Sequence, residues 1–125
     1  MPPKPKFTKE IILNTALEIV RSEGWPSLSA RNIAKRLDAS VGPIYSSLQS
    51  MGALEEELIG EVYALLHESM MTPRTDDPVL NLGLGYIVFA RDEKRLFKCL
   101  IDEKYSVQRK LHSERLWQSL SKKFL

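Results

Sequence analysis

The sequence predicts an all-α protein, and three observations support this prediction. Apolar residues recur at three- and four-residue spacing along most of the chain, which is the period of an amphipathic helix. The strict two-residue alternation of a half-buried β-strand is absent. Finally, short polar residues, glycines and prolines stand where helices of this spacing would begin and end.

Seven helices follow from the apolar periodicity and from the residues at helix ends. Short polar side chains can accept hydrogen bonds from the free N–H groups of a helix start, and the expected N-caps are Thr8, Ser29, Ser40, Asp77 and Asp92. Gly24 suits the position after the first helix, and Pro78 suits the first position of the fifth. The predicted helices cover about residues 9–23, 30–37, 41–48, 52–70, 79–91, 93–101 and 104–123.

The second and third predicted helices are short and are separated by only three residues, Asp38 to Ser40. They follow a longer amphipathic helix. This is the pattern of a helix-turn-helix, in which one short helix braces another that enters the major groove of DNA. Short helical hairpins also occur in ordinary protein cores, so the spacing alone leaves a purely structural role open.

Positive charge is concentrated in the N-terminal part of the chain. Residues 1–48 hold seven cations and four anions, a net charge of +3, whereas residues 49–125 hold eleven cations and twelve anions. A modest excess of this kind is consistent with contact to phosphates.

The later helices predict a connector and a second helical domain. The fourth, residues 52–70, is long and amphipathic and is expected to link the two parts. The fifth, residues 79–91, is apolar on nearly every side and must be covered by other helices. Its apolar stretch is too short to span a bilayer, so we expect no membrane contact.

The N-terminal residues resemble the DNA-binding domain of TetR/AcrR-type regulators. The resemblance spans about residues 7–66 and is most specific on the third helix, where a small polar residue, a glycine, an aliphatic residue and a tyrosine follow an Ile-Ala pair at the usual distance. The residues that carry it are Ile12, Ala16, Gly24, Leu28, Ser29, Ile33, Ala34, Lys35, Arg36, Leu37, Ser40, Val41, Gly42, Pro43, Ile44, Tyr45 and Leu54.

This resemblance implies a transcriptional regulator whose partner is double-stranded DNA. It assigns phosphate contacts to Ser29 and Tyr45, and it lets Arg31 donate to guanine O6 and N7. Alternatively, Tyr45 is a half-buried core aromatic residue, and Arg31 is a solvated charge or a phosphate contact. The implied DNA-binding residues are Ser29, Arg31, Ser40, Val41, Gly42, Pro43, Tyr45, Ser46 and Ser47.

Three positions depart from the family pattern. Asp38 stands where a turn glycine is common, so it must accept a positive φ or a different turn. Leu48 and Met51 stand where phenylalanine and a phosphate-binding lysine are common. These departures predict weaker DNA binding than is usual for the family.

Residues 79–101 resemble the central helices of a TetR-type effector domain. The resemblance implies a repressor that is released by a small lipophilic effector, although core packing is the alternative role for each residue of the implied pocket. That pocket would be lined by Leu84, Tyr86, Ile87, Phe89 and Phe97.

The expected architecture is a three-helix helix-turn-helix head joined through the long fourth helix to a helical C-terminal domain. The two domains are expected over residues 7–66 and 67–125, the second incomplete because family members usually continue further. A homodimer is expected because two heads on a two-fold operator bind more tightly than one. Its expected surface is the stripe Leu116, Trp117, Leu120 and Phe124.

Two other classes of function were considered. An enzyme is not expected, because Cys99, His67 and His112 form no known catalytic or metal-binding spacing, and we expect no cofactor and no metal. The single cysteine also excludes an intramolecular disulfide, which favours a cytoplasmic location, and the resemblance implies a bacterial protein. The remaining alternative is a helical protein-interaction module that no longer binds DNA.

Overall fold

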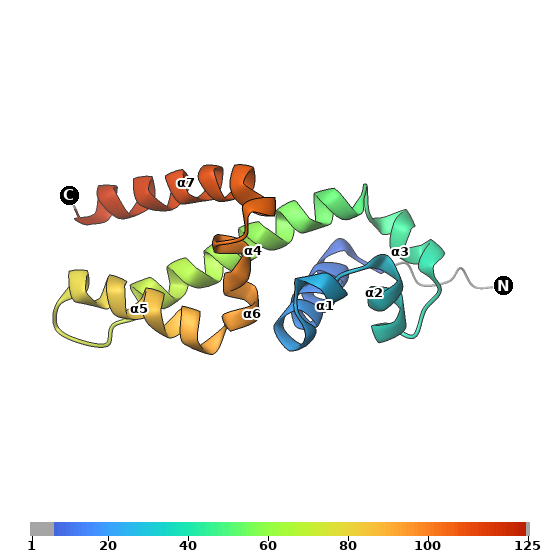
Figure 1. Cartoon of the computed structure of the whole chain (residues 1–125), viewed down its shortest axis with the longest axis horizontal. Helices are drawn as coiled ribbons and strands as arrows, with labels where there is room; N and C mark the ends of the chain where they lie inside the picture. The colour runs from blue at the N-terminus through green and yellow to red at the C-terminus, as the bar shows by residue number, and fades with distance from the viewer. Residues whose placement is uncertain (1–6, 125) are drawn as a thin grey trace. The chain divides into compact units, whose positions relative to one another are not determined.

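The computed structural model describes residues 7–124, and within them every regular element is a helix (Figure 1). Seven α-helices and three short 3-10 helices occur there and no β-strand, which confirms the predicted all-α class. The α-helices are α1 (Lys9–Glu23), α2 (Ala30–Arg36), α3 (Val41–Ser47), α4 (Met51–Met71), α5 (Pro78–Asp92), α6 (Lys94–Phe97) and α7 (Ser106–Phe124). The 3-10 helices are η1 (Trp25–Ser27), η2 (Lys98–Leu100) and η3 (Glu103–Tyr105).

The chain divides into two compact units, each described here by itself. The N-terminal unit ends at Leu58 and the C-terminal unit begins at Ile59, so α4 contributes residues to both. The sequence placed the domain boundary further along the same helix, between residues 66 and 67.

Three expected capping positions shape the N-terminal unit. The Thr8 hydroxyl accepts a hydrogen bond from the Ile11 N–H at 3.2 Å and starts α1. At the other end of that helix Gly24 has a φ of 96°, which glycine adopts without strain. Ser29 starts α2 by accepting a hydrogen bond from the Asn32 N–H. These caps explain why the observed bounds of α1 and α2 lie within one residue of the predicted ones.

The connection between α2 and α3 is tight and contains one unusual backbone conformation. Asp38 has a φ of 51°, in the left-handed region that few residues other than glycine, asparagine and aspartate adopt. The N–H of Ala39 then donates to the Ala34 carbonyl at 2.9 Å and closes the end of α2. The resulting pair of short helices after α1 fits the predicted helix-turn-helix.

The core of the N-terminal unit comes from one face of each of its helices. The buried positions recur at three- and four-residue spacing, as expected for amphipathic helices that pack on one another. Its buried side chains are Ile12, Ala16, Ile19, Val20, Ala30, Ile33, Ala34, Ile44, Leu54 and Leu58.

In the C-terminal unit, α5 crosses α4 at a glycine. A Cβ on Gly85 would overlap the Ser69 carbonyl oxygen and the Met70 Cα, and it would lie 2.6 Å from the Met70 nitrogen. The Ser69 hydroxyl also donates to the Gly85 carbonyl at 2.7 Å. Although α5 is apolar, no helix within residues 7–124 is both long and apolar enough to cross a membrane.

The loop before α5 is held by a buried amide that the sequence analysis did not single out. Asn81 is only 7% exposed. Its Oδ1 accepts hydrogen bonds from the N–H of Arg74, at 3.2 Å, and from the N–H and hydroxyl of Thr75, both at 2.8 Å. Its Nδ2 donates to the Thr75 carbonyl at 3.1 Å. One side chain therefore satisfies four polar groups of the loop.

Two expectations for the C-terminal unit are wrong in detail. Asp92 does not cap the next helix, because it is the last residue of α5 and accepts hydrogen bonds from Arg91. The helix expected over 93–101 is divided instead into α6 and η2.

The stripe expected to form a dimer is not a continuous exposed surface. Leu120 is 3% exposed and belongs to the core of its own chain, whereas Trp117 is 61% exposed and lies to one side. Leu116 and Phe124 are half-buried. The expected stripe is therefore not available as one surface, because its central side chain is buried.

Candidate nucleic-acid interface

Helix α3 buries one side chain and exposes a short, uncharged outer face. Ile44 is fully buried and fixes the helix on the N-terminal unit. On the far side from Ile44 lie Gly42, Tyr45 and Ser46, and Tyr45 is 55% exposed. The alternative of a core role for Tyr45 therefore does not fit the structure. Gly42 has no side chain, and a Cβ at this position would meet no atom within 4 Å, so the backbone of α3 is accessible on this face.

The hydroxyl groups of α3 are used in different ways. Ser46 donates to the Gly42 carbonyl one turn earlier, at 3.1 Å, so it remains on the exposed face. Ser47, which was expected in the groove, donates instead to the Phe7 carbonyl at 2.7 Å. Its hydroxyl ties the end of α3 to the residues before α1. Of the other expected residues, Ser40 is exposed and lacks a capping hydrogen bond, while Val41 and Pro43 are half-buried.

The start of α2 is rigidly held. The Ser29 oxygen accepts a hydrogen bond from the Asn32 N–H at 3.0 Å, and the Asn32 amide donates to the Ser27 carbonyl at 2.7 Å. Because the Ser29 oxygen acts only as an acceptor in this pair, its hydroxyl hydrogen can still be donated to a phosphate.

Cations on α2 fall into two groups, which differ in whether they form an ion pair. Arg36 donates to the Glu23 carboxylate at 2.8 Å and to the Ser22 hydroxyl at 2.9 Å, so it holds α2 to the end of α1. Arg31 and Lys35 are exposed, and neither has an ion pair with another residue in 7–124. They lie four residues apart and therefore on one face. Lys35 was not among the expected site residues; its spacing from Arg31 was the signal that could have identified it.

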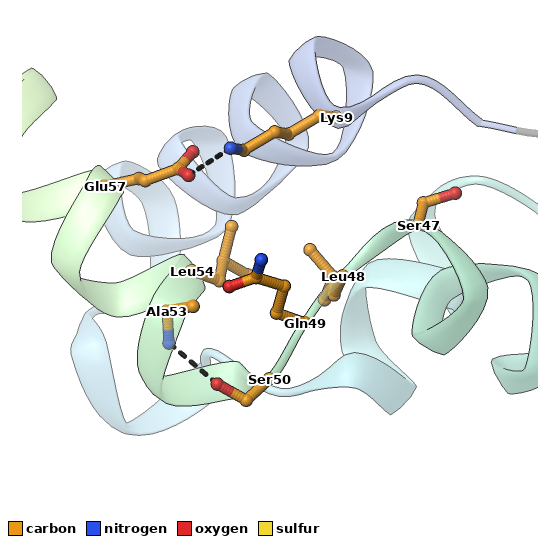
Figure 2. Close-up of a pocket in the computed structure, with 8 residues that line it drawn as sticks. All are labelled: Lys9, Ser47, Leu48, Gln49, Ser50, Ala53, Leu54 and Glu57. Atoms are coloured by element: carbon orange, nitrogen blue, oxygen red, sulfur yellow. Dashed lines mark hydrogen bonds and ion pairs between the residues drawn. The ribbon is translucent and has the colours of Figure 1, made fainter.

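A cavity of about 250 Å³ lies beside the start of α4 (Figure 2). Ser50 caps the helix by accepting a hydrogen bond from the Ala53 N–H at 3.0 Å. Lys9 forms an ion pair with Glu57 at the rim, so its ammonium group is already engaged. The residues that line the cavity are Lys9, Ser47, Leu48, Gln49, Ser50, Ala53, Leu54 and Glu57.

The residues expected to bind an effector are only partly brought together. The ring of Phe97 lies edge-on to Tyr86, with centroids 5.5 Å apart, and 6.5 Å from the ring of Phe89. Phe89 is buried and Leu84 half-buried. Ile87 is 64% exposed on another side of α5. The structure therefore forms an aromatic cluster from three of the five residues.

Of the candidate nucleophilic and metal-binding side chains, Cys99 is buried and His112 is half-buried in the C-terminal unit. Burial raises the pKa of the Cys99 thiol to about 12, so the thiol stays protonated at neutral pH. His112 stacks on Tyr63, with ring centroids 5.2 Å apart, and packs over Gly60. Burial also raises the pKa of Tyr63 to about 12. In the described part of the chain, no three histidine, cysteine or carboxylate side chains are placed to hold a metal ion.

Comparison with known proteins adds no assignment: no protein-family model matches the chain, and no curated protein matches it. A function therefore has to be inferred from the geometry and charge of α2 and α3.

Proposed function

We propose that the chain is a DNA-binding transcriptional regulator of the TetR/AcrR type, a cytoplasmic repressor whose α3 enters the major groove. The observation that carries this proposal is the exposed, uncharged outer face of α3 beside an α2 whose Arg31 and Lys35 are free to meet phosphates or bases. Tyr45 would donate its hydroxyl to a phosphate from the same face.

Release by a small lipophilic effector is the second part of the proposal. It rests on the aromatic cluster that Phe97 of α6 forms with Tyr86 and Phe89 of the apolar helix α5. An effector that binds the DNA-free form more tightly must weaken DNA binding by the same factor. A panel of lipophilic compounds that neither raises the melting temperature nor changes DNA affinity would contradict this part alone.

DNA binding is tested most directly by its salt dependence. We expect the chain to bind a non-specific duplex at low salt, with log affinity falling linearly as log salt concentration rises. Removing Lys35 (Lys35→Ala) should reduce the magnitude of that slope by about 1 if it contacts a phosphate. Lys110→Ala, which removes an exposed lysine from α7, is the matched control and should leave the slope unchanged.

The competing function is a protein-interaction module that no longer binds DNA. Two sequence observations motivated this alternative. Asp38 and Met51 depart from the family pattern, and a stripe centred on Leu120 could bind a partner. Because Leu120 is buried in its own chain, that stripe does not favour the alternative. Absence of duplex binding at low salt would nevertheless favour it over the DNA-binding proposal.

We expect Arg31→Ala to relax the preference for one base pair of the preferred site. A bidentate contact from arginine to guanine is worth about 1–3 kcal/mol of discrimination against the wrong base. Selection on randomised duplexes, followed by affinity measurements on single-base variants, checks this. Arg36→Ala is the matched control, because Arg36 is bound to Glu23 and should not affect the preference. If Arg31→Ala left the base preference unchanged at every position of the site, Arg31 would contact only phosphate or solvent.

Asp38→Gly should stabilise the N-terminal unit by about 1 kcal/mol. Glycine removes the left-handed strain of about 1–2 kcal/mol, and its larger unfolded-state entropy offsets part of that gain. The change also removes a negative charge from the turn before α3, so DNA affinity should rise as well. Chemical denaturation and duplex titration measure the two effects.

The control for this prediction is Ala39→Gly, at the next residue, whose φ is not positive. Here glycine relieves no strain and should destabilise the unit. If Asp38→Gly were no more stable than Ala39→Gly, the left-handed turn would cost little in this chain.

A further inference from the structure

The cavity beside the start of α4 combines apolar lining side chains with a charged rim (Figure 2). Leu48 and Leu54 supply most of the apolar lining, and the Lys9–Glu57 ion pair lies at the rim. The volume is about 250 Å³. An apolar cavity of about 150 Å³ already admits benzene, so this one has room for an aromatic ring with a short substituent.

The two charged groups at the rim differ in how easily they can leave. The Lys9 side chain is 64% exposed and begins α1, whereas the Glu57 side chain is 37% exposed and lies in the second turn of α4. Exposed ion pairs of this kind contribute little to stability. The long Lys9 side chain can therefore turn into solvent at little cost, and the Glu57 carboxylate remains at the mouth of the cavity.

The charge of α4 favours a cationic ligand over an anionic one. This helix carries five glutamates and no lysine or arginine. Three of them, Glu55 to Glu57, fall in its first two turns, where they also offset the positive end of the helix dipole. A ligand with a carboxylate would be repelled by these side chains, whereas an ammonium group would be attracted.

A polar side chain without a partner lines the same cavity. The Gln49 amide makes no hydrogen bond to another residue within 7–124 (Figure 2). Its oxygen can accept a hydrogen bond, and a primary ammonium group has three N–H donors. One donor can meet Glu57 and a second can meet Gln49, while the third stays in water.

We propose that this cavity binds a small primary amine. Its ammonium group takes the place of Lys9 on the Glu57 carboxylate, and its apolar body lies against Leu48 and Leu54. The Lys9 side chain is itself an alkylammonium group held at the rim, so a free amine offers Glu57 the same chemical group. All the lining residues belong to the N-terminal unit, so the site is distinct from the aromatic cluster of the C-terminal unit. The inference does not depend on DNA binding.

Titration of the full chain with benzylamine, benzyl alcohol and benzoate, without DNA, tests the ligand class. The three compounds share a ring and differ in the charge of the attached group. Benzylamine should bind with a dissociation constant of about 1 mM and shift the NMR signals of the Gln49 side-chain amide and the Ala53 N–H. The other two should bind at least about tenfold more weakly. The proposal is overturned by equal affinity for the alcohol, or by no binding of benzylamine at roughly 10 mM.

Three variants test the assignment of the ammonium group to Glu57. Glu57→Gln keeps the size of the side chain and should weaken benzylamine binding at least about tenfold. Glu56→Gln is the matched control, because this neighbouring carboxylate is exposed and does not line the cavity. Lys9→Met removes the competing ammonium group and should tighten binding severalfold. Circular dichroism checks that each variant keeps its helices.

Two results with these variants would overturn the proposal. Equal losses in Glu57→Gln and Glu56→Gln would indicate a general attraction to an acidic helix rather than a site. Unchanged or weaker binding to Lys9→Met would show that the amine does not take the place of Lys9.

Discussion

Gly85→Ala is expected to lower the free energy of unfolding by about 2–4 kcal/mol. The added Cβ would overlap the Ser69 carbonyl and the Met70 Cα, which are backbone atoms that cannot rotate away. The two helices must therefore move apart, and the hydrogen bond from the Ser69 hydroxyl to the Gly85 carbonyl is lost with them. Urea denaturation measures the change.

The same substitution two residues earlier should have the opposite sign. Gly83→Ala meets open space and gains helix propensity, so it should raise the free energy of unfolding by about 0.5–1 kcal/mol. The two variants have identical composition and differ only in which side of α5 receives the methyl group. If both were stabilising, α5 would not cross α4 at Gly85.

Asn81→Ala should cost about 2–3 kcal/mol of stability. Removing the amide leaves the N–H groups of Arg74 and Thr75 and the Thr75 carbonyl without their partner. The loop that these groups hold, residues 72–77, should then open more often. Trypsin cleavage after Arg74 should accelerate in parallel with the loss of stability, and both can be measured on the same preparation.

Gln118→Ala provides the control for this prediction. It also removes a side-chain amide, but from an exposed position on α7, so the expected change is within about 0.5 kcal/mol. Unchanged stability and unchanged cleavage at Arg74 in Asn81→Ala would show that the loop does not depend on the buried amide.

Helix positions could be predicted from the sequence because the signals that set them are local. Thr8, Ser29 and Asp77 each cap a helix within three residues of their own position, and Gly24 ends α1 by its own φ. Where two local interactions competed, the prediction failed. Asp92 was expected to cap the next helix, but the adjacent Arg91 engages its carboxylate instead.

The candidate site was less predictable because its details depend on contacts between distant residues. The Ser47 hydroxyl meets a carbonyl forty positions away in the sequence, at Phe7. A helical projection places both Arg31 and Arg36 outward, about 140° apart, but does not show which of them meets an anion. Only the position of Glu23 at the end of α1 distinguishes the bound arginine from the free one.

The uncharged outer face of α3 bears on how such a protein would find its target in a genome. Each mismatched base pair typically costs a specific binder about 1–3 kcal/mol, and a genome offers roughly a million or more competing sites. Small hydroxyls and a bare glycine backbone discriminate weakly between bases, so one copy would meet many nearly equivalent sequences. Since the free energies of two bound copies add, their discrimination ratios multiply. Under the proposed function, selectivity would therefore come from the number of copies bound and from the spacing of their sites.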